Sequence, residues 1–242
     1  IEACAAGERA GLYYTCINSH LNAAELAFIV NDSLARVLIT SRAQRAVALA
    51  ALAACPRLEL LLMLDAGPDD APFVDYEGAI AAMPATPIAD ESLGGAMLYS
   101  SGTTGRPKGV LRPLPEAAPE ELTPLFRALH TMWHHRPGMV YLSPAPLYHS
   151  APQAAVNLTL RSGGTAVIME RFDPEQFLAL VERHRVSHSQ LVPTMFSRML
   201  KLPAAVRTRY QIASLECAVH AAAPCPPQVK RDMIDWWGPC IH

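Results

Sequence analysis

Hydrophobic and polar positions along the chain follow two periods in turn, one typical of helices and one typical of strands. Asn22 and Glu25 form a capping-box signature, and the apolar residues Leu26, Ile29 and Val30 then mark one face of a helix. Short apolar runs bounded by turn residues predict strands at 36–40, 58–64, 96–99, 140–142, 166–168, 186–192 and 216–221. Helices are predicted after Asn22, between Ser41 and Pro56, between Thr123 and Pro137, near 154–160, after Asp173 and over 227–237.

The order of these elements indicates the fold class. Helices and strands alternate, which favours an α/β architecture with mostly parallel sheets flanked by helices. Residues 65–95 are rich in Pro, Asp, Gly and Ala, so we assign them mainly to loop, and we expect Ser41 to cap the helix that follows it. In the helix after Thr123, we expect the packing face to consist of Leu125, Leu129 and Met132.

Composition and charge exclude several classes of protein. Of the 242 residues, 51% are hydrophobic and 17% are charged, which excludes an intrinsically disordered chain. The 20 Lys and Arg residues against 22 Asp and Glu residues give a net charge of −2, so we expect neither nucleic acid nor an anionic membrane surface as a partner. No apolar run approaches the ~20 residues of a membrane-spanning helix, so we predict no transmembrane segment. A homo-oligomer is compatible with the sequence.

Six cysteines occur without a CxxC pair or a compact framework, which is typical of reduced thiols in a cytoplasmic protein. Cys217, His220 and Cys225 are close in sequence, but their spacing matches no zinc pattern, so we predict structural roles and assign no metal ligand. For His220, the wall of a pocket and the protein core are both compatible with the sequence. We expect three further histidines on a solvated face or near the C-terminal dipole of the helix after Thr123: His130, His134 and His135.

The segment from Tyr99 to Val110, YSSGTTGRPKGV, carries the most specific pattern in the chain. It predicts a strand that leads into a flexible loop with four hydroxyl groups, three glycines and one lysine. Glycine lets backbone N–H groups approach an anion, hydroxyls donate to phosphate oxygens, and lysine adds a positive charge on a long stem. The composition suits a polyphosphate, but composition alone suits an ordinary Ser/Gly turn equally well. The segment is not a Walker loop, because Lys108 follows Pro107 and precedes Gly109.

The order of residues 100–109 matches the signature S/T-S/G-G-S/T-T-G-x-P-K-G throughout. On this segment the chain resembles the adenylate-forming (AMP-binding) superfamily, which includes acyl-CoA and aryl-CoA synthetases. Further segments are similar to the superfamily in the same order along the chain, and residues 191–195 resemble its fatty-acyl-CoA synthetase branch. These segments are 146–149 (PLYH), 171–174 (RFDP), 191–195 (LVPTM), 221–224 (AAAP) and 238–239 (GP).

The resemblance implies a reaction in two steps. A carboxylate and Mg-ATP give an acyl-adenylate and pyrophosphate, and the thiol of coenzyme A then displaces AMP, so ATP, Mg²⁺ and coenzyme A are the implied cofactors. Lys108 and His149 are the implied catalytic residues, and His149 would gate or orient the carboxylate beside the α-phosphate. The residues that the resemblance places on the β- and γ-phosphates are Ser100, Ser101, Gly102, Thr103, Thr104, Gly105 and Lys108. Those that it places along the adenine are Ala221, Ala222, Ala223 and Pro224, where many members of the superfamily have glycine at the first two positions.

The resemblance also implies an incomplete N-terminal AMP-binding domain over residues 1–242. Residues 1–95 would form its first α/β part, and residues 96–242 would carry the phosphate loop, the acyl pocket and the adenine pocket. The chain begins at Ile1 without an initiator Met and ends at His242, just before the expected Tyr-Gly-x-Thr-Glu motif. We therefore expect the C-terminal domain and the magnesium-binding glutamate to be absent, and we predict that these 242 residues alone are inactive or nearly so.

The expected substrate class follows from the lack of an acidic residue in the segment 148–152. Residues 148–152 (YHSAP) lack the aspartate with which amino-acid-activating members pair a substrate ammonium, and a buried unpaired ammonium is strongly penalised. We expect an apolar acid, first a fatty acid and second an aryl or polycyclic acid. An enzyme that releases acyl-AMP without coenzyme A and a non-catalytic nucleotide-binding module are the alternatives. The residues expected around the acyl group are Ala154, Ala155, Val156, Leu191, Val192, Met195 and Phe196.

Overall fold

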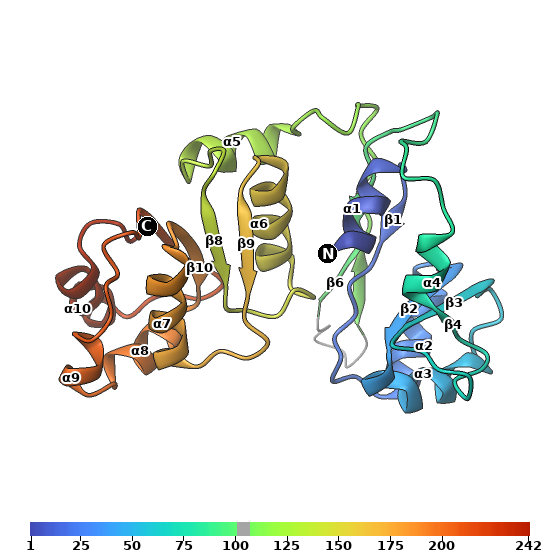
Figure 1. The fold of residues 1–242 in the computed structure, drawn as a ribbon, viewed down its shortest axis with the longest axis horizontal. Helices are drawn as coiled ribbons and strands as arrows, with labels where there is room; N and C mark the ends of the chain where they lie inside the picture. The colour runs from blue at the N-terminus through green and yellow to red at the C-terminus, as the bar shows by residue number, and fades with distance from the viewer. Residues whose placement is uncertain (101–106) are drawn as a thin grey trace. The chain divides into compact units, whose positions relative to one another are not determined.

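The computed structural model describes residues 1–100 and 107–242, which form two compact units. The first unit spans Glu2–Pro119 and the second Glu120–His242 (Figure 1). In the described residues, no helix combines the length and the apolar character that crossing a bilayer requires. The resemblance implied that residues 1–95 form a first α/β part and that residues 96–242 carry the pockets. This division of the domain stays a prediction.

The first unit alternates short helices and short strands along the chain. A single 3₁₀ turn, Arg42–Gln44, separates a strand from a helix in this unit. Its elements are α1 (Glu2–Arg9), β1 (Tyr13–Tyr14), α2 (Ala23–Asp32), β2 (Val37–Ser41), α3 (Arg45–Leu52), β3 (Leu60–Leu64), β4 (Val74–Asp75), α4 (Tyr76–Ala81), β5 (Gly95–Ala96), β6 (Leu98–Ser100) and β7 (Lys108–Val110).

The three strands β2, β3 and β4 form a parallel sheet, with Val37 opposite Leu60 at the start of its register. Helices α2 and α3 pack on each other through a small apolar cluster, and α3 also covers β2 and β3 at Leu38 and Met63. The predicted capping box of α2 is confirmed, since Asn22 accepts from the N–H of Glu25 and Glu25 accepts from that of Asn22. The cap predicted at Ser41 is wrong, because a 3₁₀ turn follows Ser41 and its side chain makes no capping bond.

Residues 65–95 are less irregular than we predicted. Strand β4 adds to the parallel sheet, and helix α4 follows it directly. The helix begins where the carboxylate of Asp75 accepts from the N–H of Gly78, a capping bond that stabilises a helix start. Aspartate is common both in turns and at helix starts, so the sequence pattern around Asp75 did not distinguish a loop from a helix of only six residues.

The second unit repeats the alternation with longer helices. Its helix α10 has the predicted bounds, and α8 and α9 were not predicted. Its elements are α5 (Pro124–Met132), β8 (Val140–Ser143), α6 (Ser150–Arg161), β9 (Thr165–Ile168), α7 (Pro174–His184), β10 (His188–Leu191), α8 (Pro193–Leu200), α9 (Ala204–Arg207), β11 (Cys217–His220) and α10 (Pro227–Trp237).

The four strands of the second unit form one parallel sheet in the order β11-β10-β8-β9. Successive side chains of a strand point to opposite faces. Leu142 belongs to the large core that includes Phe177 and Phe196, whereas its neighbour Tyr141 packs with Val156 of α6. Helices therefore cover both faces of this sheet, and the predicted fold class, α/β with mostly parallel sheets flanked by helices, is confirmed (Figure 1).

Helix α5 is present, but its packing face is not the predicted one. Leu125 and Met132 are 53% and 57% exposed, so two of the three expected core positions face solvent. The half-buried residues of the helix follow the spacing i, i+3, i+4, i+7 instead. These residues are Phe126, Leu129, His130 and Trp133.

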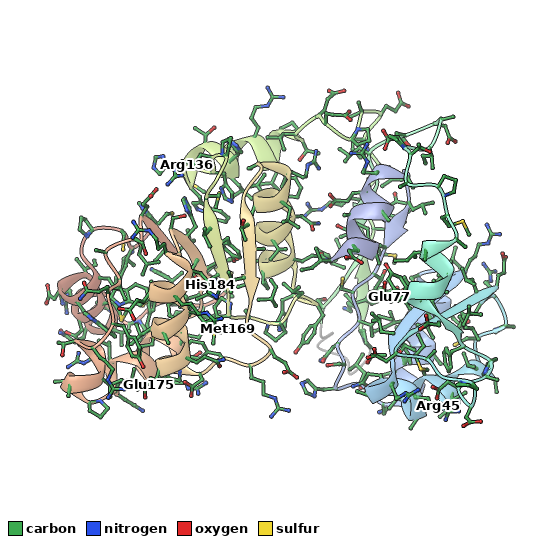
Figure 2. The ribbon with its side chains drawn as sticks, in the orientation of Figure 1. Arg45, Glu77, Arg136, Met169, Glu175 and His184 are labelled. Atoms are coloured by element: carbon green, nitrogen blue, oxygen red, sulfur yellow. The ribbon has the colours of Figure 1, made fainter. Side chains whose placement is uncertain are left out.

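Ion pairs on the surface of each unit join its elements. Arg45 of α3 lies 2.7 Å from Asp70, and Glu175 of α7 lies 2.7 Å from Arg209 (Figure 2). The pair of Glu175 and Arg209 is exposed on both sides and contributes little to stability, whereas Asp70 is only 8% exposed.

Candidate functional site

The segment predicted to bind phosphate is bounded by the two strands of an antiparallel pair. In strands β6 and β7, Leu98 lies opposite Val110 and Ser100 lies opposite Lys108. Ser100 and Lys108 are both exposed at this end of the pair. Five of the predicted phosphate-binding residues lie outside the described residues: Ser101, Gly102, Thr103, Thr104 and Gly105.

The base of this strand pair is fixed by side chains of the first unit. The Tyr99 hydroxyl donates a 2.6 Å hydrogen bond to Asp32, the last residue of α2. Burial raises the pKa of Tyr99, and the hydrogen bond to Asp32 and its negative charge raise it further, so the phenol stays protonated. A Cβ on Gly109 would lie 2.7 Å from Met97 Cε and 3.0 Å from Tyr99 Cζ, so an alanine at this position would require these side chains to shift.

The other predicted site residues lie at the carboxyl edge of the parallel sheet in the second unit. From β8 the chain passes through α6 to β9 on one side, and it then crosses through α7 to β10 on the other side. The carboxyl ends of β8 and β10 therefore flank the point where the strand order reverses. Ligands of open α/β sheets bind at such points. His149 follows β8 and Ala221 follows β11 at this edge.

His149 is the residue that begins helix α6. Its carbonyl accepts the N–H of Gln153 at 3.2 Å, and its own N–H donates to Pro146 at 3.2 Å. The imidazole makes no capping hydrogen bond and is exposed, with its ring centroid 4.5 Å from that of Tyr148. The backbone therefore fixes the residue while the ring faces solvent. The nearby N-terminus of α6 favours negative charge.

The predicted adenine-side segment leaves the neighbouring strand at the same edge. Ala221 donates its N–H to Leu191 at 3.1 Å, which extends the pairing of β11 with β10 by one residue. Ala222 has φ of 72°, a left-handed conformation that costs an alanine free energy and a glycine almost none. Ala222, Ala223 and Pro224 are exposed. The chain thus bends sharply at one of the two positions where alanine replaces the glycine of many superfamily members.

His220 is half-buried at the end of β11, with its ring edge-on to Phe196 at 6.0 Å. Burial lowers its pKa, and the charge of Lys230 lowers it further. Phe196 is fully buried in the core. The sequence left two roles open for His220, the wall of a pocket and the protein core. The contact with Phe196 supports the role in core packing.

Most of the residues expected to surround the acyl group are core residues. Ala155, Val156, Leu191 and Phe196 are each 2% exposed or less, and they belong to the two apolar clusters of the second unit. The expectation that they line an acyl pocket is therefore not met, because they stabilise the sheet itself. The three half-buried members of the set are Ala154, Val192 and Met195.

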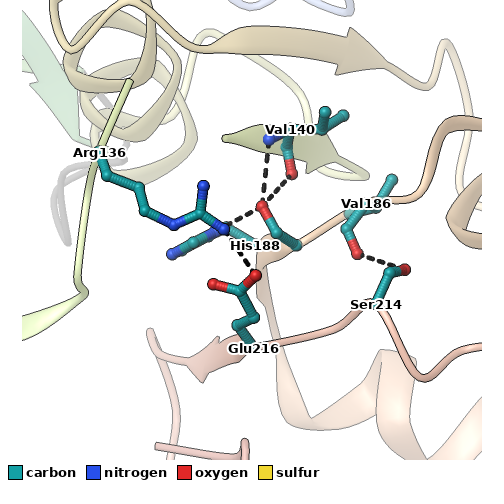
Figure 3. A network of polar contacts seen from close by, with 7 residues as sticks. Arg136, Val140, Val186, His188, Ser214 and Glu216 are labelled. Atoms are coloured by element: carbon teal, nitrogen blue, oxygen red, sulfur yellow. Dashed lines mark hydrogen bonds and ion pairs between the residues drawn. The ribbon is translucent and has the colours of Figure 1, made fainter. Parts of the chain in front are cut away.

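A buried histidine pair near the start of the same sheet was missed by the sequence analysis. His135 is 6% exposed and His188 is 3% exposed, and their ring centroids lie 5.9 Å apart. Figure 3 shows His188 beside the Arg136–Glu216 ion pair, whose closest N···O distance is 2.6 Å. Of the two placements expected for His135, the solvated face is wrong, because His134 adopts φ of 52° and the chain turns after α5 so that His135 is buried.

Among residues 1–100 and 107–242, no three side chains of His, Cys, Asp and Glu gather in a way that could hold a metal. The exposed groups at the carboxyl edge are an imidazole, a helix N-terminus and a bent backbone segment. A helix N-terminus favours the binding of an anion such as a phosphate.

A family model described as AMP-binding enzyme matches residues 1–242. The medium/long-chain-fatty-acid–CoA ligase FadD8 of Mycobacterium tuberculosis is 27% identical over 97% of this chain and 41% of its own length. The 4-coumarate–CoA ligase-like 3 of Oryza sativa subsp. japonica is 32% identical over 89% of this chain and 39% of its own length.

A solved structure, the inhibitor-bound N-terminal domain of FACL13 from M. tuberculosis, has a TM-score of 0.77 at 23% identity, over 93% of this chain and 54% of that one. The chain thus spans about two fifths of the length of these two curated relatives. The fold, the order of the motifs and the family match over the whole chain agree. The chain belongs to the family of AMP-binding enzymes.

Proposed function

We propose that the protein containing this chain is an AMP-forming acyl-CoA synthetase for an apolar carboxylic acid. In the first step a carboxylate oxygen attacks the α-phosphorus of Mg-ATP, which gives acyl-AMP and pyrophosphate. In the second step the thiol of coenzyme A attacks the acyl carbon and AMP leaves. The observation that carries the proposal is the family match over residues 1–242, which includes the complete phosphate-loop signature.

The proposed residue roles rest on the membership in the AMP-binding family and are compatible with the place of each residue. Lys108 begins the strand that leaves the Ser/Gly/Thr segment, and its exposed ammonium would neutralise the charge that builds on the leaving pyrophosphate. Ser100 ends the opposite strand and would donate to the same phosphates together with residues 101–105. His149, exposed at the start of α6, would orient the carboxylate beside the α-phosphate. Residues 221–224 would lie along the adenine.

Magnesium would enter as part of the substrate Mg-ATP. Mg²⁺ is usually bound through one or two carboxylates together with the phosphates of the substrate. Because ATP and coenzyme A are the co-substrates and the cysteines are thiols, we also propose a cytoplasmic location.

A fatty acid is the first proposed substrate and an aryl acid is the second. The relative FadD8 is a fatty-acid–CoA ligase by its description and supports the first class. The relative from O. sativa is described as 4-coumarate–CoA ligase-like and supports the second. In the described set of acyl-side residues, Ala154, Val192 and Met195 offer apolar surface without a charge that would bind an amino acid.

The test is an adenylation assay on the whole protein. ATP–pyrophosphate exchange is measured over a panel of fatty and aryl acids, and acyl-CoA is measured with and without coenzyme A. Lys108→Ala should lower the exchange rate by about 100-fold to 1000-fold, the usual effect of removing one group that stabilises developing charge. Lys201→Ala removes an exposed lysine with no assigned role and should leave the rate unchanged. The proposal fails if no acid supports exchange, or if Lys108→Ala behaves like the control.

A further inference from the structure

Two cysteines of the first unit that are separate in sequence meet in the structure. The sulfur atoms of Cys4, on α1, and Cys16, beyond β1, lie 3.4 Å apart. Both residues are half-buried, so a small reagent in solution can reach them. Both sulfurs are thiols. A pair of accessible thiols in contact is the arrangement from which a disulfide forms most readily.

The local fold holds the two thiols together. The chain reverses after α1, where Gly11 has φ of 63° and the N–H of Leu12 donates to Gly7 at 3.0 Å. Strand β1 then runs back beside the helix, and the Tyr14 hydroxyl donates to Glu8 at 2.7 Å. Glu8 and Tyr14 both lie between Cys4 and Cys16 in the chain, so this hydrogen bond holds the segments that carry the two cysteines side by side.

The other four cysteines offer no comparable accessible pair, although Cys217 and Cys240 are close enough for the charge of Cys240 to raise the pKa of Cys217. Cys55, Cys217 and Cys240 are 4%, 2% and 8% exposed, and burial raises the pKa of each thiol, that of Cys217 to about 11. A thiol of this kind forms little thiolate and reacts slowly. Cys225 is half-buried, but it lies in the second unit, beyond β11. Proximity and access therefore coincide at Cys4 and Cys16.

We propose that Cys4 and Cys16 form a redox-active pair that closes a reversible intramolecular disulfide when it reacts with a low-molecular-weight disulfide. The thiolate of one cysteine attacks a sulfur of the oxidant, which releases one thiol and leaves a mixed disulfide. The second cysteine then attacks the bound protein sulfur and releases the second thiol. Two electrons pass from the protein sulfurs to the oxidant, and the two protons of the cysteines end on the released thiols.

Little movement is needed for the second step. A disulfide bond is about 2.05 Å long, so sulfurs that start 3.4 Å apart must approach by about 1.4 Å, which rotation of the side chains can supply. The closed bond would join α1 to the segment beyond β1. Strand β1 pairs with β5, and β5 is separated from β6 by one residue, so oxidation would stiffen the framework that precedes the Ser/Gly/Thr segment.

The test is equilibration of the whole protein in glutathione buffers of increasing oxidised fraction, followed by acid quenching, alkylation in denaturant and peptide mass spectrometry. The expected result is a peptide pair that joins Cys4 to Cys16 and disappears after treatment with a reductant. Of the chain's six cysteines, four instead of six then take up the alkylating label. The midpoint of thermal unfolding should rise in the oxidised protein, because the crosslink restricts the unfolded chain.

Single variants separate a pair from two independent thiols. In Cys4→Ser and in Cys16→Ser the reaction should stop at a mixed disulfide with glutathione on the remaining cysteine. Cys225→Ser leaves the pair intact and should still form the linked peptide. Two glutathione adducts on the unaltered protein, a link to any other cysteine, or full alkylation of both residues at every buffer ratio would overturn the proposal. None of these outcomes depends on adenylation activity.

Discussion

The hydroxyl of Tyr99 donates a 2.6 Å hydrogen bond to Asp32, and this bond joins strand β6 to the last residue of helix α2. Strand β6 ends at Ser100, where the Ser/Gly/Thr segment begins. Burial of the phenol, together with the bond and the charge of Asp32, raises the pKa of Tyr99, so the donor keeps its proton over the whole physiological range. One tyrosine therefore anchors the strand that leads into the proposed phosphate loop.

Removal of this hydroxyl should loosen the strand pair. We expect Tyr99→Phe to lower the free energy of unfolding by about 1 kcal/mol, the typical net value of one hydrogen bond. It should also raise KM for ATP in the whole protein. Asp32→Asn keeps an acceptor for the phenol and should lose less in both measurements. Urea unfolding and ATP saturation curves test this, and equal behaviour of Tyr99→Phe and the unaltered protein would contradict it.

Two adjacent glycines offer a matched pair of substitutions in the first unit. A Cβ on Gly94 would lie 2.2 Å from the carbonyl oxygen of Gly7 and 2.5 Å from that of Leu12, and neither backbone atom can withdraw. A Cβ on Gly95 would meet only Leu114 Cδ2, at 3.3 Å, which is the end of a flexible side chain.

Gly94→Ala should therefore cost more than about 3 kcal/mol of stability, whereas Gly95→Ala should cost less than about 1 kcal/mol. The two stability losses differ because Gly94 also donates its N–H to Glu8 at 2.8 Å. A shift of the Gly94 backbone would therefore break the contact of this segment with α1. Denaturant unfolding of both variants gives the comparison. Similar stability losses in the two variants would show that the close approach at Gly94 is not a constraint.

Local pattern predicted the second unit well where a helix carries its own start and stop signals. Helix α10 has the predicted bounds because Pro227 opens it and Gly238, with φ of 81°, ends it. Helix α7 begins where Asp173 accepts from the N–H of Gln176 at 2.8 Å, as a cap pattern in the sequence indicates. The predicted packing face of α5 was wrong because the buried face of a helix depends on its tertiary surroundings, and the helix sequence alone does not contain that information.

For the site, the sequence predicted the positions of motifs but not the environment of side chains. His149 and residues 221–224 lie at the same edge of the sheet because parallel strands place their carboxyl ends together. The contact of Cys4 with Cys16 and that of His135 with His188 depend on chain reversals that no short pattern encodes. Phe196 is apolar whether it lines a pocket or fills a core, so its burial had to come from the structure.

The buried histidine pair predicts how stability depends on pH. Burial, together with the charges of the neighbouring His188 and His130, lowers the pKa of His135 from 6.5 to about 4. The unfolded chain binds this proton at higher pH than the folded chain does. The stability that the neutral ring contributes is therefore complete above about pH 6.5 and is lost as the pH falls toward about 4. The loss should be on the order of 3 kcal/mol.

His135→Leu keeps an apolar group of similar size and removes the titration. We expect this variant to lose much less stability than the unaltered protein when urea unfolding is compared at about pH 7 and about pH 4. Burial also lowers the pKa of His188, so part of the dependence should remain. The control is His184→Leu, at an exposed histidine of α7, which should keep the full dependence. A variant His135→Leu with the unaltered pH profile would exclude His135 as its source.

The left-handed residue in the proposed adenine segment gives a last pair of variants. Ala222 has φ of 72°, whereas Ala223 is not among the described residues with positive φ. Ala222→Gly removes a steric cost of about 1–2 kcal/mol but adds freedom to the unfolded chain, so we expect a gain of up to about 1 kcal/mol. Ala223→Gly adds only the freedom and should lose about 0.5–1 kcal/mol. Urea unfolding should therefore show a higher free energy of unfolding for Ala222→Gly and a lower one for Ala223→Gly. Two losses of equal size would show that the backbone of Ala222 is not strained.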